Sequence, residues 1–190
     1  MSNSRCNQIA GLALLAGLTA PGAMAQDWPM WGGTEGRNMS SPATGLPAEF
    51  VAGDFVGATD EIDPTSTKNV KWIAKLGSQS YGNATIANGR VYVGTNNDSP
   101  RDARFKGDRC TVYCLDEESG DLIWQLNIPK LGTGKVSDWE YLGICSSPSI
   151  DGDRVYLVTN RCEVMCLDVN GMADGNQGYQ DEGIYNAWPS

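Results

Sequence analysis

The chain has 190 residues, with 14 basic and 23 acidic side chains and a formal net charge of −9. This balance argues against binding to nucleic acid or to anionic lipid, because both depend on clusters of Lys and Arg. The sequence contains no histidine, so this chain alone cannot complete a Ser-His-Asp triad, a His-ligated zinc site or a Cys-x-x-Cys-His haem site.

The first 25 residues have the pattern of an export signal. Arg5 supplies a positive charge, Ile9 to Leu18 form an apolar run, and Ala23-Met24-Ala25 form a small-x-small cleavage site. The apolar run is too short for a transmembrane helix, which needs about 20 residues. We therefore expect cleavage before Gln26, a periplasmic location, and no membrane insertion of the mature chain.

Residues 26–67 are rich in Gly, Pro, Ser and Asp, and we expect an irregular lead-in with turns there. Residues 68–190 form the next predicted region, in which short alternating β-patterns are dense as far as Asp168. Within it, Ile86–Asn96 aligns without a gap with Ile150–Asn160, 64 residues later. Shorter segments repeat at a spacing of 52 residues: Val112–Asp116 with Val164–Asp168, and Val70–Trp72 with Leu122–Trp124.

Each repeated unit resembles a meander of short strands joined by tight turns. Asn88-Gly89, Gly152-Asp153 and Ser119-Gly120 provide the turn residues between apolar runs. Four-stranded units at this period are typical of propeller blades, which bury their faces against their neighbours. The predicted fold is therefore all-β, a β-propeller fragment of about two four-stranded blades out of a probable eight, after an irregular N-terminal segment. The second unit ends after its third strand, so we expect the chain to be truncated before a ring could close.

The run from Cys114 to Trp124 resembles the tryptophan-docking motif of the PQQ-repeat (pyrroloquinoline-quinone-binding-like) β-propellers. The resemblance assigns Asp116, Ser119 and Gly120 to the turn before the last strand and Trp124 to the docking position. Trp72 and Asp168 are the repeat equivalents of Trp124 and Asp116. Lining a cofactor is the alternative for the two tryptophans, and packing between blades is the favoured interpretation.

The lead-in is similar to the start of the quinoprotein dehydrogenases, on the segments Asp27–Gly33 and Asn69–Gly77. Catalytic relatives hold the quinone and a calcium ion beneath a disulfide between adjacent cysteines, with an Arg and a Glu nearby. Here those positions carry Ile144-Cys145 and, in place of the Glu, Tyr81. Tyr81 and Cys145 are thus the family-equivalent cofactor positions, and no Arg follows Cys145 before Asp153.

Two functions follow from this resemblance. The first is an exported, non-catalytic propeller that acts as a periplasmic binding or assembly scaffold, similar to the outer-membrane assembly propellers, with no cofactor expected and its protein or small-molecule partner unidentified. The second is the N-terminal part of a quinone-dependent alcohol or sugar dehydrogenase, with PQQ and calcium bound. The missing second cysteine, Arg and Glu favour the scaffold.

Five cysteines remain after cleavage, and we expect no metal site among them. Cys110 and Cys114, like Cys162 and Cys166, are four apart, which in a strand places their sulfurs too far apart for one zinc ion. We expect buried side chains at equivalent positions. A disulfide between Cys145 and Cys162 is one possibility, because both should lie near the Thr159 end of unit two. The charged loop from Asn97 to Arg109 is expected to be a solvated surface, with binding of a partner as the alternative.

Overall fold

The computed structural model describes residues 26–132 and 138–171. Apart from the short 3-10 helix η1 (Pro64–Ser66), its regular structure consists of strands, so the all-β prediction is confirmed. The predicted export signal, residues 1–25, lies outside the described residues. No helix in the described part of the chain is long and apolar enough to cross a membrane.

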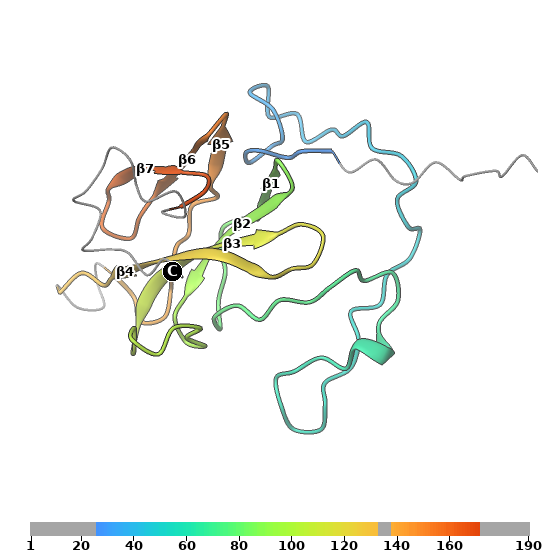
Figure 1. Ribbon diagram of the computed structural model, residues 1–190, viewed down its shortest axis with the longest axis horizontal. Coiled ribbons are helices and arrows are strands. Elements are labelled where there is room, and N and C mark those ends of the chain that lie inside the picture. The colour runs from blue at the N-terminus through green and yellow to red at the C-terminus, as the bar shows by residue number, and fades with distance from the viewer. Residues whose placement is uncertain (1–25, 133–137, 172–190) are drawn as a thin grey trace, which may run out of the picture.

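The strands form two antiparallel sheets in meander order (Figure 1). Sheet one contains β1 (Thr85–Ala87), β2 (Arg90–Asn96), β3 (Arg109–Asp116) and β4 (Leu122–Pro129). Sheet two contains β5 (Ser149–Asp151), β6 (Arg154–Val158) and β7 (Val164–Asp168). Among the described residues the two sheets do not close into a ring.

The pairing of the strands confirms the internal repeat. Thr85 pairs with Tyr92 and Ser149 with Tyr156, and on the next ladder Tyr92 pairs with Cys114 and Tyr156 with Cys166. Each pair in sheet two is the sequence equivalent of the pair in sheet one. The repeated residues therefore specify the same register twice, which is expected where alternate side chains must reach one buried face.

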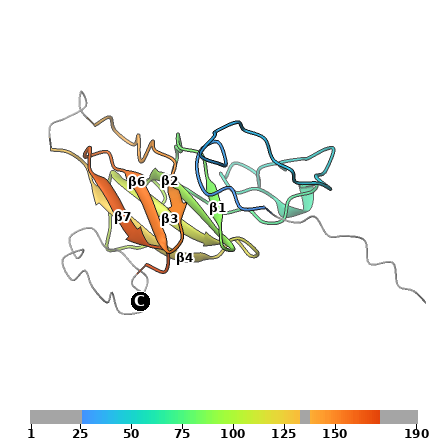
Figure 2. The same ribbon diagram turned by 90° about the horizontal axis from the view of Figure 1, so that it is seen from above.

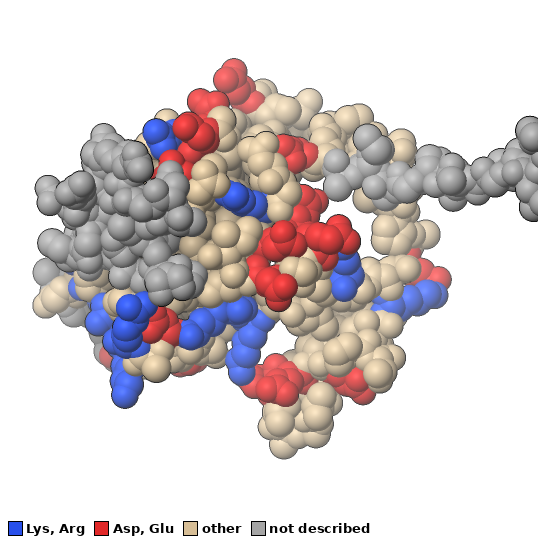
Figure 3. All heavy atoms as spheres, in the orientation of Figure 1, with Lys and Arg blue, Asp and Glu red and all other residues tan. Residues whose placement is uncertain are grey.

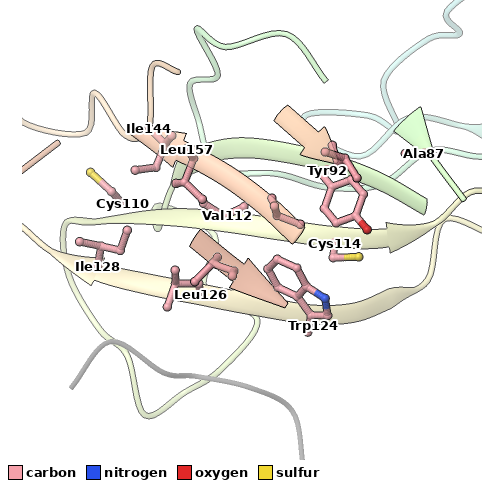
Figure 4. Packing of buried hydrophobic residues seen from close by; sticks show 13 residues of the cluster. Ala87, Tyr92, Cys110, Val112, Cys114, Trp124, Leu126, Ile128, Ile144 and Leu157 are labelled. Atoms are coloured by element: carbon pink, nitrogen blue, oxygen red, sulfur yellow. The ribbon is translucent and has the colours of Figure 1, made fainter. Parts of the chain in front are cut away.

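The core lies between the two sheets, which Figure 2 shows from above as two stacked layers. One face of sheet one packs against sheet two, and Figure 4 shows the two sets of side chains facing each other. Sheet one contributes Tyr92, Val112, Cys114, Trp124 and Leu126, and sheet two contributes Ile150, Val155, Leu157 and Leu167. The rings of Tyr92 and Trp124 tilt against each other with their centroids 6.0 Å apart. This interface removes large aromatic and aliphatic side chains from water, which is the main stabilising contribution to the fold.

The expectation that all four strand-spaced cysteines are buried is wrong for the second pair. Cys110 and Cys114 are fully buried in β3, whereas Cys162 and Cys166 are exposed. Cys162 precedes β7 in a turn with a positive φ of 61° instead of lying in the strand. The face of β7 that carries Cys166 has no further sheet packed on it among the described residues, so the equivalent position is uncovered.

Residues 26–67 contain no strand and are held by isolated bridges. Trp28 exchanges two backbone hydrogen bonds with Ile86, at 2.7 and 3.0 Å, and the carbonyl of Pro29 accepts from the Ile150 amide at 2.8 Å. The lead-in thus attaches to the first strand of both sheets.

Candidate functional site

The turn after β3 is organised by the carboxylate of Asp116. Its Oδ1 accepts hydrogen bonds from the amides of Glu118 and Ser119, at 2.9 and 2.8 Å, and from the Ser119 hydroxyl at 3.1 Å. These bonds favour the ionised form and hold the pKa of Asp116 below its usual value. In sheet two, Asp168 accepts from the Asn170 amide at 2.8 Å, which is the equivalent bond.

Gly120 completes this turn with a φ of +77°, a conformation that favours glycine. The ring of Trp72 lies against it, so closely that a Cβ at Gly120 would stand 2.6 Å from the ring. A side chain at this position would therefore displace the tryptophan as well as strain the backbone.

Trp72 and Trp124 make equivalent hydrogen bonds to successive sheets. The Nε1 of Trp72 donates to the carbonyl of Glu117, and the Nε1 of Trp124 donates to the carbonyl of Val169, both at 2.8 Å. Donors and acceptors are each 52 residues apart in the sequence. Each tryptophan therefore joins the chain before one sheet to the turn after the third strand of that sheet.

The opposite end of the sheets carries the two family-equivalent cofactor positions. The segment that contains Tyr81 runs beside the segment that contains Cys145. The amide of Asn83 donates to the Ser147 hydroxyl at 2.9 Å, and Gly82 lies against the Ser146 carbonyl. The structure thus brings the two segments together, with Tyr81 62% exposed and Cys145 also on the surface.

Ile144, the neighbour of Cys145, points the other way. It is fully buried, its side chain packs over Gly94 of β2, and its amide donates to the carbonyl of Thr95 at 3.2 Å. Ile144 belongs to the core between the sheets, so its side chain is not presented at the surface beside Cys145.

A buried ion pair lies next to Cys145. Asp138 is 2% exposed and Lys130 is 15% exposed, and the Lys130 ammonium contacts the Asp138 carboxylate directly. The other oxygen of Asp138 accepts from the Leu131 amide at 2.9 Å and from the Asn160 side-chain amide at 2.7 Å. Burial by itself raises the pKa of Asp138, but these hydrogen bonds and the Lys130 charge outweigh it and hold the pKa below its usual value.

This ion pair was missed at the sequence level. The sequence contains no signal that joins Lys130, Asp138 and Asn160. They come from three segments: the end of β4, the loop after it, and the loop after β6. Only the packing of unit two on unit one brings them together.

A small pocket of about 200 Å³ opens beside this pair, with Asp138, Cys145, Ser146 and Asn160 among its lining residues. Pockets for small molecules are typically about 300–1,000 Å³, so this one is below that range. Burial raises the pKa of the Cys145 thiol, which lowers its thiolate fraction. The thiols of Cys145 and Cys162 are free, and the proposed disulfide between them stays a prediction.

Among the described residues no group of three His, Cys, Asp or Glu side chains is placed to hold a metal ion. The loop between β2 and β3 contains Arg101, Arg104 and Lys106, and blue spheres gather at that end of sheet one in Figure 3. Its guanidinium groups already have partners: Arg101 lies over the Tyr113 ring, Arg104 pairs with Asp102, and Arg109 lies over Phe105. This internal pairing agrees with a structured surface loop.

No protein-family model matches the chain, and no curated protein sequence is significantly similar to it. The class defined by the structure is therefore an all-β protein of two repeated, face-packed antiparallel sheets.

Proposed function

We propose that the two sheets are successive blades of a PQQ-repeat-type β-propeller, and that the protein is an exported periplasmic binding or assembly scaffold. The propeller interpretation is supported by the equivalent hydrogen bonds of Trp72 and Trp124. A radial array requires each unit to dock on the next in the same way, and these two bonds repeat one contact at the repeat spacing.

The scaffold interpretation depends on what surrounds Cys145. A quinone held in the manner of the dehydrogenases needs a flat sulfur pair above it and a cation beside it. Here the residue next to Cys145 is Ile144, buried in the core, and the nearby Lys130 is already neutralised by Asp138. Tyr81 offers an aromatic ring but no negative charge for calcium.

The size and charge of the neighbouring pocket point in the same direction. About 200 Å³ is below the usual volume of a ligand pocket, and the ion pair between Lys130 and Asp138 at its wall offers no unpaired cation to an anionic quinone. A missing charge-assisted contact costs about 1.5–3 kcal/mol, or roughly a ten- to hundredfold loss of affinity. We therefore expect weak binding of pyrroloquinoline quinone or none.

The test is a titration of the purified protein with pyrroloquinoline quinone in the presence of calcium. Quinone absorbance reports binding, and dye-linked oxidation of alcohols and sugars reports turnover. We expect neither stoichiometric binding nor turnover. Tight binding with turnover that is abolished by Cys145→Ala would establish the dehydrogenase instead. The exposed Cys166→Ala, distant from the pocket, is the matched control.

A further inference from the structure

The interface between the two sheets joins two different faces. The face of sheet one that carries Tyr92, Val112 and Cys114 packs on the face of sheet two that carries Val155, Leu157 and Leu167. Because the sequence repeats, sheet two also has a face equivalent to the Tyr92 face of sheet one, and sheet one also has a face equivalent to the Val155 face of sheet two. One chain therefore carries both surfaces that a second interface of the same type would need.

The first half is the outer face of sheet two. Tyr156 and Val164 are the equivalents of Tyr92 and Val112, which are fully buried, yet Tyr156 is 40% exposed and Val164 77% exposed. Val158 at 49% and the exposed Cys166 extend the same face. At its edge, β7 pairs only with β6 among the described residues, whereas its equivalent β3 pairs with both β2 and β4.

The second half is the segment Val70–Leu76, which aligns with the start of β4. Its side chains alternate between half-buried and exposed, as in a strand with one covered face. Trp72, Ala74 and Leu76 pack on Val91, Val93, Tyr113 and Leu115 of sheet one. The backbone of Val70–Leu76 makes no backbone–backbone hydrogen bond to any described residue. The segment therefore has the one-sided burial pattern of a fourth strand but is not paired with a sheet by backbone hydrogen bonds.

A groove runs along this segment. It has a volume of about 940 Å³ and is bounded on one side by residues 70–78 and on the other by parts of the lead-in, including Phe55, Ile62 and Pro64. An extended chain placed there would meet backbone groups that make no backbone–backbone hydrogen bond, although the Lys75 carbonyl accepts from the Arg101 guanidinium at 2.7 Å. This is the arrangement for adding a strand.

We propose that this groove receives β7 of a second copy of the chain, so that copies associate head to tail. The three-stranded sheet of one copy and Val70–Leu76 of the next form a complete four-stranded sheet. This composite sheet packs on sheet one of the second copy as sheet one packs on sheet two. Because the two surfaces differ, the contact is heterologous and produces closed rings or short filaments.

The repeat also specifies the register. In sheet one, Cys114 pairs with Trp124, Tyr113 with Gln125 and Thr111 with Asn127. Adding the 52-residue spacing to each β3 residue and subtracting it from each β4 residue gives the expected pairs between copies. These pairs are Cys166 with Trp72, Met165 with Ile73 and Glu163 with Lys75. The last pair has opposite charges, which is favourable for residues directly across a ladder. This association uses only the inter-sheet packing and does not depend on the proposed binding role.

The experiment combines oligomeric state with directed cross-linking of the full chain. Light scattering over a range of concentrations should show association that increases with concentration. In a background with Cys145, Cys162 and Cys166 changed to Ser, a copy with Ile73→Cys and a mass-tagged copy with Met165→Cys should form a mixed disulfide. Asp153→Cys, exposed at the far turn of sheet two, replaces Met165→Cys in the control mixture and should not cross-link to Ile73→Cys.

A charge exchange tests the register. Lys75→Glu should weaken association about two- to fivefold by placing like charges across the ladder. Adding Glu163→Lys to the same chain should restore it. Because Lys75 also pairs with Asp60 within the chain, Asp60→Asn is the control and should leave association unchanged. A monomer at all concentrations, equal cross-linking of Asp153→Cys, or no rescue by the double exchange would each overturn the proposal.

Discussion

The loop end of the sheets contains the buried ion pair between Lys130 and Asp138. Hydrogen bonds from Leu131 and Asn160 replace the lost solvation of the Asp138 carboxylate, and the Lys130 ammonium donates to the Trp139 carbonyl at 2.6 Å. A buried pair of this kind is weak evidence of net stability, but the loss of one partner is costly because the other charge remains buried.

The first prediction is that Asp138→Asn lowers the free energy of unfolding at pH 7 by about 3–5 kcal/mol, measured by urea denaturation. The exposed pair between Asp60 and Lys75 provides the control: Asp60→Asn should have a much smaller effect, because water screens an exposed ion pair. A loss no larger than that of Asp60→Asn would contradict the structural role of the buried pair.

The same residue gives the second prediction, on pH. The folded-state pKa of Asp138 is depressed, so its contribution is fully present above the unfolded value of about 3.9 and is lost as the pH falls through the folded value. Urea midpoints measured from pH 7 down to pH 3 should fall in the wild type, with the loss concentrated below about pH 4. The decline should be shallower in Asp138→Asn, and parallel profiles for the two proteins would refute the assignment.

The cysteines provide a third prediction. Burial raises the pKa of Cys110 and of Cys114 to about 12, so neither should react with a thiol reagent at pH 8 until the protein unfolds. Cys162 and Cys166 should react quickly and Cys145 more slowly, as followed by peptide mapping after timed labelling. If Cys145 and Cys162 both resist labelling until a reductant is added, they form the disulfide that the sequence suggested.

At the scale of elements, the tryptophans join units that the backbone ladder does not connect. Trp124 is almost fully buried, whereas Trp72 is half-buried in an equivalent place. The difference arises because Trp124 is covered by sheet two and Trp72 borders the open groove.

The fourth prediction uses this difference. Trp124→Phe keeps an aromatic ring but leaves the Val169 carbonyl without its indole donor, and should lower the unfolding free energy by about 1–3 kcal/mol. Trp72→Phe should cost less because water can reach the Glu117 carbonyl in its place. Trp139→Phe, at a residue that is 67% exposed, should have no measurable effect. Equal losses for all three variants would rule out a specific docking role.

At the scale of the whole molecule, the surface is organised by repetition. The turns carrying Asp116 and Asp168 lie at one end of the sheets, and the loops carrying Tyr81, Cys145 and the buried ion pair lie at the other. The turns at one end take part in packing between units through the two tryptophan bonds, and the loops at the other end carry the exposed Tyr81 and Cys145.

The fifth prediction concerns maturation, on residues outside the described part of the chain. The signal at residues 1–25 should be removed on export, which makes Gln26 the first residue. Intact-mass measurement of protein recovered from the periplasm checks the cleavage, with cytoplasmic protein lacking export as the control. Retention of Met1 in the exported protein would show that the apolar run has another role.

The short strands, the tight turns between them and the internal repeat could be predicted from the sequence. Alternating apolar residues with Asn-Gly and Gly-Asp turns are local signals, and the repeat shows them twice, so Tyr92 opposite Cys114 and Tyr156 opposite Cys166 follow from short segments. The aligned tryptophans could likewise be recognised as a pair, since they recur at the same spacing.

Which of these equivalent positions are buried, and which polar groups meet, depends on how the two sheets pack. Cys114 and Cys166 have the same register, yet one is covered by a neighbouring sheet and the other is exposed. The meeting of Lys130 with Asp138 and Asn160 depends on how unit two packs on unit one. Burial and charge pairing depend on how the units pack against each other. A local sequence pattern can specify a strand, but it does not specify which residues cover that strand.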